Sequence, residues 1–226
     1  MKVLLIIDLQ NDFCPGGTLA VAGGDQLAKV INQLIDSGEY DLIVASADWH
    51  PSNHVSYAET HDLPCYGEIE IGGVLQRLWP IHCEQGSQGA AFHRDLKTGS
   101  IDRVILKGTN PDIDSYSAFY DNQRLGETEL KTYLEQQALS RGQSKHHIEV
   151  SLCGLALDYC VLYSALDAVS LGYKTEVIVD ACRAVNLNPG DDLIALRKLA
   201  AAGVGLTDAR EIVADKGIAQ SLHLEA

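Results

Sequence analysis

Short apolar runs alternate with longer amphipathic stretches along the chain, and this alternation limits the fold more than any other feature. Strands are predicted at six runs rich in β-branched residues: 2–7, 41–46, 103–107, 148–152, 175–179 and 203–206. Helices are predicted at four stretches: 24–37, 127–141, 160–171 and 190–202. The strand runs are continuously apolar, which is typical of parallel strands covered by helices on both faces. We therefore expect a single three-layer αβα domain of the α/β class over residues 1–226.

The stretch from about 50 to 100 departs from this alternation. It contains Pro51, Pro64 and Pro80, many glycines and little periodicity. A loop region of this length inside a compact domain is usually functional. We predict an irregular active-site segment here. After Leu206 we expect only a last short helix without chemistry.

The charge balance argues against two classes of partner. The chain has 31 acidic and 17 basic residues, a formal net charge of −14 and an isoelectric point near 4.8. Such a surface opposes binding to phosphate backbones and to anionic lipid. We predict no nucleic-acid partner and no membrane attachment.

The start of the chain and its cysteines favour a cytoplasmic location. The first apolar run extends only from Val3 to Ile7 before Asp8, which is too short for the core of a signal peptide. No apolar run approaches the roughly 20 residues that cross a bilayer. The six cysteines contain no CxxC pair and need no disulfides in a chain of this size. We expect a cytoplasmic enzyme or binding protein.

Two carboxylates, a lysine and a thiol follow the first four predicted strands, in the order Asp8, Asp48, Lys107 and Cys160. Ligands of open parallel sheets bind outside the carboxyl ends of the strands. Each residue alone has an ordinary explanation, since an aspartate after a strand commonly caps a turn and a lysine there is usually solvated. Their coincidence at one edge predicts an active site.

Cys160 has two interpretations. A cysteine is most often a small buried hydrophobe, and Cys153 and Cys182 fit that description. Cys160 instead opens a predicted helix, where the helix dipole and a nearby Lys107 would lower the pKa of its thiol, to roughly 3.5–7.5 in comparable settings. We predict that Cys160 is the reactive thiol.

A thiol nucleophile needs a proton acceptor. Asp8 could take the proton and return it to a leaving amine, if Lys107 stabilises the carboxylate in a dry pocket. A set of Asp8, Lys107 and Cys160 fits nucleophilic attack on an acyl carbon. It fits phosphoryl transfer poorly, because the sequence has no glycine-rich phosphate loop and no Walker lysine.

A metal site is predicted from "ADWHPSNH" and "LWPIHC". Asp48 and His50 project to the same side of an extended segment, and His82 could reach the same point. One carboxylate and two imidazoles suit zinc, iron or manganese and leave positions open for water or a ligand. A salt bridge or a capped turn is the alternative. His54 either lines the metal shell or hydrogen-bonds within its loop, and we favour the loop.

Five motifs occur in the order and spacing of a known family: "IIDLQNDFCPGG", "DWHPSNHVSYA", "LWPIHC", "KGTNPDIDSYSAF" and "GLALDYCV". On these motifs the chain resembles the nicotinamidase/pyrazinamidase group of the isochorismatase-like cysteine amidohydrolase superfamily. The match runs from Met1 to about Leu206. The aspartate–histidine pair with a distant histidine separates this group from superfamily relatives that lack the metal.

The resemblance implies a fold and a reaction. The fold is a six-stranded, mainly parallel sheet with strand order 3-2-1-4-5-6. The reaction converts nicotinamide to nicotinate and ammonia, and pyrazinamide to pyrazinoate, through a cysteine thioester, which is a step of NAD salvage. The partner is then the small molecule nicotinamide, and the resemblance leaves a homo-oligomer open.

The resemblance also implies catalytic roles. Asp8 would be the acid and base, Lys107 the charge that tunes it, and Cys160 the nucleophile. The backbone N–H groups of Ala156 and Cys160 would form an oxyanion hole, and a cis peptide between Leu155 and Ala156 would aim the first of them.

The implied cofactor is one divalent metal ion that binds the ring nitrogen of the substrate. Zinc is the expected ion, with iron or manganese as alternatives, and its ligands would be Asp48, His50 and His82. The ring pocket would be walled by Phe13, Trp79 and Tyr116, which could equally be core aromatics. Neither His54 nor Ser56 is assigned to the metal shell.

Three other functions stay open at this point. A superfamily enzyme for carbamoyl or ureido compounds would need no pyridine-binding metal. A metal-binding interaction protein could have kept the fold and lost the chemistry, although the intact set of Asp8, Lys107 and Cys160 argues against this. A hydrolase that uses a metal-bound hydroxide would not need Cys160.

Overall fold

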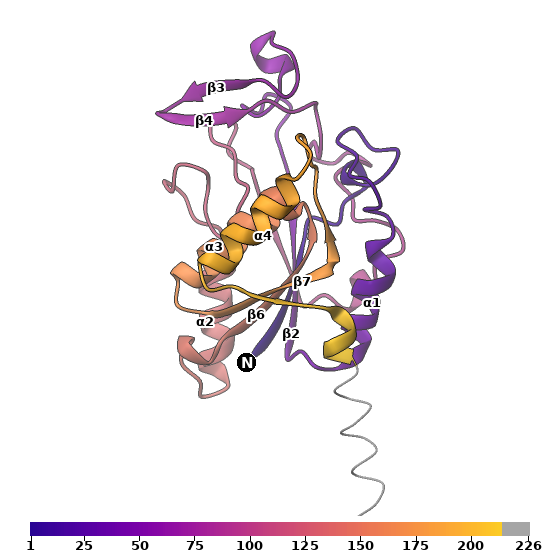
Figure 1. Ribbon diagram of the computed structural model, residues 1–226. Helices are drawn as coiled ribbons and strands as arrows, with labels where there is room; N and C mark the ends of the chain where they lie inside the picture. Colours follow the sequence, from indigo (N-terminus) through magenta and orange to yellow (C-terminus); the bar gives the residue numbers. More distant parts are fainter. Residues whose placement is uncertain (214–226) are drawn as a thin grey trace, which may run out of the picture.

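A sheet of six parallel strands forms the centre of the computed structural model, which describes residues 1–213 (Figure 1). The order across the sheet is β5-β2-β1-β6-β7-β8, and all neighbouring strands are parallel. The strands are β1 (Lys2–Ile7), β2 (Leu42–Asp48), β5 (Arg103–Lys107), β6 (Glu149–Leu155), β7 (Lys174–Arg183) and β8 (Gly205–Thr207). Counted along the chain, these six strands have the order 3-2-1-4-5-6. The predicted fold class is confirmed.

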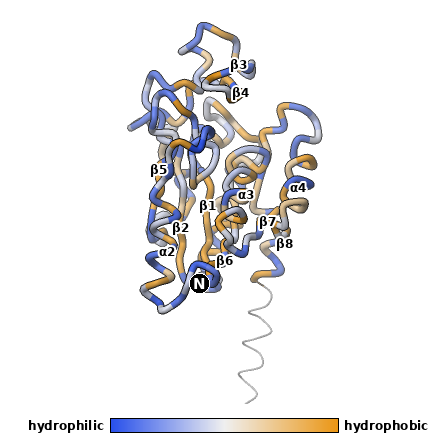
Figure 2. The backbone as a smooth tube through the Cα atoms, turned by 90° about the vertical axis from the view of Figure 1, so that its left-hand side faces the viewer, coloured by the Kyte–Doolittle hydropathy of each residue, from blue (hydrophilic) through white to orange (hydrophobic). Residues whose placement is uncertain are grey.

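Helices cover both faces of this sheet (Figure 1). Val3, Leu5 and Ile7 of β1 belong to one buried cluster, and Leu4 and Ile6 belong to another. Adjacent residues of a strand point to opposite faces, and the tube of β1 is hydrophobic along its length in Figure 2. The first cluster includes residues of α2 (Leu130–Ser140), α3 (Leu162–Ser170) and α4 (Asp191–Ala201), and the second includes residues of α1 (Leu27–Ser37). The result is the predicted arrangement of three layers.

α1 illustrates how the sequence pattern produces a helix. Its buried residues Leu27, Ile31, Leu34 and Ile35 recur at intervals of three or four, so they share one face that packs on the sheet. The helix stops at Gly38, whose φ of +67° is a left-handed conformation that glycine adopts without steric cost. The chain then turns into β2.

The stretch from 50 to 100 is more regular than predicted. It contains an antiparallel hairpin of β3 (Glu68–Ile71) and β4 (Val74–Arg77), which is not part of the main sheet (Figure 1). The strands meet at Gly72 and Gly73, both with positive φ, as two-residue hairpin turns require. The prediction of little regular structure was wrong at 68–77, where the alternating run EIEI followed by two glycines is a hairpin signal that was overlooked.

The last predicted helix can be compared only in part. Residues 209–213 are helical, and the remainder of the predicted stretch lies outside the described residues. Within residues 1–213, no helix is both long and apolar enough to cross a bilayer.

Replacing Gly154 by alanine should destabilise the sheet. Gly154 in β6 has φ +116°, and a Cβ there would overlap the backbone of Ile7 in the neighbouring β1. Strained backbone and overpacking each cost about 1–3 kcal/mol, so we expect Gly154→Ala to lower the free energy of unfolding by more than about 2 kcal/mol. Urea denaturation would measure this loss.

Gly99→Ala is the matched control, because a Cβ at Gly99 would meet no atom within 4 Å. We expect this variant to unfold within about 0.5 kcal/mol of the original chain. Equal urea midpoints for Gly154→Ala and Gly99→Ala would contradict the packing described for β1 and β6.

Candidate active site

The carboxyl ends of neighbouring strands bring the predicted reactive residues together. Asp48 and Lys107 are register partners at the ends of β2 and β5, and Asp8 directly follows β1. Asp8 has φ +45°, which few non-glycine residues adopt. After β6, a π-helical turn over Leu157–Val161 carries Cys160. These side chains therefore meet at the carboxyl-end edge of the sheet, where the sequence predicted an active site.

Lys107 lies at the centre of this group and is buried. Its ammonium is 2.9 Å from Asp8 Oδ2 and 2.6 Å from Asp48 Oδ1. It donates to the Ser115 carbonyl oxygen at 2.9 Å, and it lies 3.4 Å from Cys160 Sγ. One cation therefore contacts two carboxylates and the thiol.

The two carboxylates differ in how easily they take up a proton. Burial raises the pKa of Asp8 to about 6, although Lys107 and the Ser46 hydroxyl, 2.7 Å away, act to lower it. Burial also acts to raise the pKa of Asp48, but Lys107 and nearby His50 outweigh it and hold this pKa well below its usual range. Asp8 can therefore exchange a proton near neutral pH, whereas Asp48 stays ionised.

Cys160 is a neutral thiol in this setting. Burial raises its pKa well above the usual value; Lys107 acts to lower it, and Asp8 raises it further. The predicted lowering of this pKa was wrong. The helical turn begins at Leu157, so Cys160 is not its first residue and gains less from the dipole. Its reactivity then depends on a nearby base that removes the proton.

Asp48, His50 and His82 form a buried group whose ligand atoms lie within 4.8 Å of one another. Nε2 of His50 is 3.6 Å and Nε2 of His82 is 4.0 Å from Asp48 Oδ2. Each Nδ1–H donates to a backbone carbonyl oxygen at 2.8 Å, that of Gly108 for His50 and that of Pro80 for His82. Histidines that bind a metal usually donate their other N–H in this way. The three residues therefore fit a divalent metal ion.

His54 lies beside this group. Its ring stacks on that of His50, with 3.9 Å between centroids, and its Nδ1 is 2.7 Å from the Ser56 hydroxyl. Its Nε2 is buried without a hydrogen-bond partner among the described residues. Burial, reinforced by His50, lowers the pKa of His54 to about 4, so the imidazole is neutral. The loop hydrogen bond favoured for His54 is present, but a ring nitrogen of His54 also lies within 4.8 Å of ligand atoms of His50 and Asp114, so both interpretations of His54 stand.

A pocket with aromatic walls opens beside Cys160. The three predicted residues Phe13, Trp79 and Tyr116 line it, and Trp79 Nε1–H donates to the Tyr116 hydroxyl at 3.2 Å. The peptide bond between Leu155 and Ala156 is cis, as predicted. The other lining residues are Leu19, Asp48, His82, Asp114, Ala156, Tyr159, Cys160 and Val185. Thiol, metal ligands and aromatic rings thus surround one space.

Several residues of the site were missed in the sequence, and Gln10, Asp114 and Tyr159 are three polar ones among them. The Gln10 amide clamps the backbone of Asp48, since it donates to the carbonyl oxygen and accepts from the N–H, each at 2.8 Å. Asp114 and Tyr159 line the pocket. All three stand one or two positions from a predicted site residue within the quoted motifs, and this proximity is the signal that could have identified them.

Comparison with known proteins identifies the family to which this chain belongs. The model of the isochorismatase domain matches residues 2–211. The chain belongs to the isochorismatase family. A member named nicotinamidase, from Escherichia coli (strain K12), is 44% identical over 207 residues, which are 91% of this chain and 93% of that protein.

Solved structures of the family share the fold. A nicotinamidase pyrazinamidase from Acinetobacter baumanii has a TM-score of 0.85 and 38% identity, covering 93% of this chain and 97% of that one. A pyrazinamidase from Pyrococcus horikoshii in complex with zinc has a TM-score of 0.70 and 32% identity, covering 92% and 98%. The chain thus spans nearly the full length of these relatives.

Replacing Lys107 by methionine should destabilise the fold, because Asp8 and Asp48 would remain as buried carboxylates without a cation. Breaking a buried ion pair by removing one partner costs about 3–5 kcal/mol. We expect that loss for Lys107→Met in urea denaturation with a chelator present. The double variant with Asp48→Asn should be more stable than Lys107→Met alone, because only the Asp8 carboxylate is then left buried without a cation.

Lys2→Met is the matched control, since Lys2 forms an exposed ion pair with Glu39 at 3.4 Å. Exposed pairs contribute only about 0–1 kcal/mol. Strictly additive losses for Lys107→Met and Asp48→Asn would show that the buried charges do not interact as described.

Proposed function

We propose that this chain hydrolyses nicotinamide to nicotinate and ammonia, and pyrazinamide to pyrazinoate. The observation that carries this proposal is the position of Cys160. Its Sγ lies within 4.8 Å of a carboxylate oxygen of Asp8 and of Asp48, and it lies beside an aromatic pocket. The lining suits a flat heteroaromatic carboxamide, because its ring can pack on Phe13 and Trp79 while the carboxamide faces the thiol. The family relatives described above are named for this activity.

Attack on the amide begins with proton transfer. Asp8 takes the proton of the Cys160 thiol, and Sγ forms a bond to the carboxamide carbon. The pKa of about 6 suits Asp8 to this task at neutral pH. Lys107 keeps the site charge balanced while the proton moves, because its ammonium contacts both Asp8 and the sulfur.

The tetrahedral intermediate then loses ammonia. Its oxyanion accepts hydrogen bonds from the backbone N–H groups of Ala156 and Cys160, each such donor being worth about 2.7–4 kcal/mol in other enzymes. Asp8 returns its proton to the amide nitrogen, the C–N bond breaks, and a thioester on Cys160 remains. Asp8 next removes a proton from water, which hydrolyses the thioester to the carboxylate product and frees the thiol.

The proposed cofactor is one zinc ion, held by Asp48, His50 and His82. A bound divalent ion supplies a Lewis acid that orients the ring nitrogen and withdraws electron density from the ring. The chain holds the ligands ready for it, because Gly108 and Pro80 fix the tautomers of the two histidines. The zinc-bound Pyrococcus relative supports the choice of zinc.

Ammonia release from nicotinamide by the purified chain tests the proposed function. We expect release that falls at least about tenfold on chelation and returns on addition of zinc. His82→Ala should lower both the rate and the bound metal, measured by elemental analysis, whereas His93→Ala, outside the metal group, should change neither. Full activity after verified metal removal would favour another amide substrate in the family. No release under any condition would refute nicotinamide as the substrate.

Cys160→Ala should abolish turnover, by at least about 10³-fold, because the bond-forming atom is removed. The fold and the metal content should be unchanged, as judged by circular dichroism and elemental analysis. Cys182→Ala is the matched control, since it removes another buried thiol outside the pocket, and it should keep most of the activity. Substantial turnover by Cys160→Ala would point to a metal-bound hydroxide as the nucleophile.

A further inference from the structure

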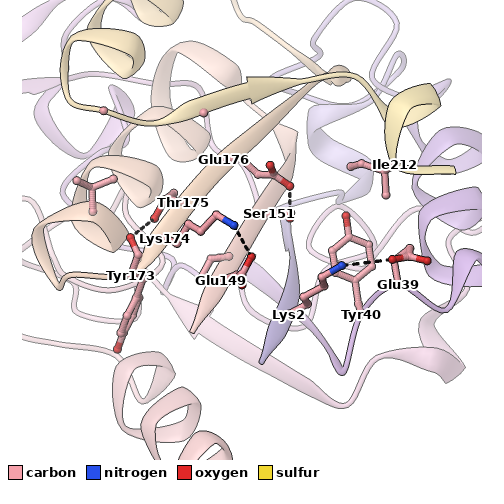
Figure 3. Close-up of a pocket in the computed structure, with 14 residues that line it drawn as sticks. Lys2, Glu39, Tyr40, Glu149, Ser151, Tyr173, Lys174, Thr175, Glu176 and Ile212 are labelled. Atoms are coloured by element: carbon pink, nitrogen blue, oxygen red, sulfur yellow. Dashed lines mark hydrogen bonds and ion pairs between the residues drawn. The ribbon is translucent and has the colours of Figure 1, made fainter. Parts of the chain in front are cut away.

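A second cavity lies at the opposite end of the sheet from Cys160, where β1, β6 and β7 begin (Figure 3). Its volume is about 570 Å³, within the range of about 300–1,000 Å³ that small-molecule sites occupy. The strands contribute Lys2, Glu149 and Lys174, and Tyr40 and Ile212 approach from outside the sheet. This cavity shares no lining residue with the catalytic pocket.

The floor of this cavity is polar, whereas the same sheet face is apolar further along the strands. Ser151 of β6 and Glu176 of β7 are register partners, and they lie on the face that carries Cys153 and Ile178 further along the same strands. Central parallel strands normally carry apolar residues on both faces. A hydroxyl and a carboxylate at this position make this part of the cavity suited to a polar ligand.

Most of the charges around the cavity pair with each other. Lys2 Nζ is 3.4 Å from Glu39, and Lys174 Nζ is 2.8 Å from Glu149. Glu176 differs from them, because it accepts only the Ser151 hydroxyl, at 2.7 Å. Among the described residues, no basic side chain lies within ion-pair distance of Glu176. The cavity thus contains one carboxylate whose charge the protein does not neutralise by direct contact.

Tyr40 adds a second oxygen acceptor at this end of the cavity. Its hydroxyl lies beside the Ser151 hydroxyl, and an oxygen that donates its proton to a neighbour still has lone pairs that can accept a hydrogen bond. In Figure 3 the hydroxyl end of Tyr40 points to the side of the cavity where Ser151, Glu176 and Ile212 lie. The ring of Tyr40 and the side chain of Ile212 provide apolar surface beside it.

We propose that this cavity binds a small organic ammonium ion, a primary amine on a compact apolar body. The ammonium donates hydrogen bonds to the Glu176 carboxylate and to the Tyr40 hydroxyl oxygen, and the apolar body packs between the Tyr40 ring and Ile212. An ammonium has three donors and no acceptor, which matches two acceptors at one end of the cavity. The net charge of −14 also favours the approach of cations over anions. This site is independent of the proposed amidase reaction.

Calorimetric titration of the full 226-residue chain with cyclohexylmethylamine tests this proposal. The neutral comparator is cyclohexylmethanol, which has a similar shape and no charge. We expect the amine to bind at least about tenfold more tightly than the alcohol, because hydrogen bonds to a charged group are the strong ones. Glu176→Gln should weaken amine binding at least about tenfold, and Tyr40→Phe about threefold or more.

Glu59→Gln is the matched control, because it removes the same charge from an exposed residue outside the cavity. We expect its amine affinity to stay within about twofold of the original chain. Equal weakening by Glu59→Gln and Glu176→Gln would reduce the effect to non-specific charge attraction and overturn the site. Binding that survives Glu176→Gln and Tyr40→Phe but is lost in Trp79→Ala would place the amine in the catalytic pocket and overturn it too. Circular dichroism and thermal melting verify that the variants are folded.

Discussion

The buried contact of Lys107 with Asp8 and Asp48 is the interaction on which the rest of the catalytic edge depends. Moving an ammonium or a carboxylate out of water costs several kcal/mol unless an opposite charge is close. The parallel sheet supplies that proximity, because β1, β2 and β5 are neighbours and end at the same edge. The same contact leaves Asp8 able to take up a proton and keeps Asp48 charged. Lys107 thus lies between Asp8, the proposed base, and Asp48, the proposed metal ligand.

Much of this edge could be predicted from the sequence, because strand ends are visible as the points where apolar runs stop. Asp8, Asp48 and Lys107 were found in this way. Gln10 was not, since its role comes from two hydrogen bonds to the backbone of Asp48, which lies 38 positions away. The pKa of Cys160 was predicted in the wrong direction, because burial depends on the packed pocket and leaves no trace in the local pattern.

The aromatic pocket shows a second limit of sequence reasoning. Phe13, Trp79 and Tyr116 come from separate segments, and their wall exists only once the irregular stretch folds back over the sheet. That stretch is fastened from both sides: Trp79 donates to the Tyr116 hydroxyl at 3.2 Å, and Gln76 Nε2 donates to Asp114 at 2.9 Å. The family motifs indicate that Phe13, Trp79 and Tyr116 line one pocket. The hydrogen bonds between the segments explain how Trp79 and Tyr116 come together.

The two oxygens of Asp48 face different partners, Oδ1 towards Lys107 and Oδ2 towards His50 and His82. A single carboxylate therefore belongs to the nucleophile's half of the site and to the metal's half. A change of the Asp48 side chain would therefore alter the charge beside Lys107 and the metal ligands together, so the two halves of the site are coupled through one residue.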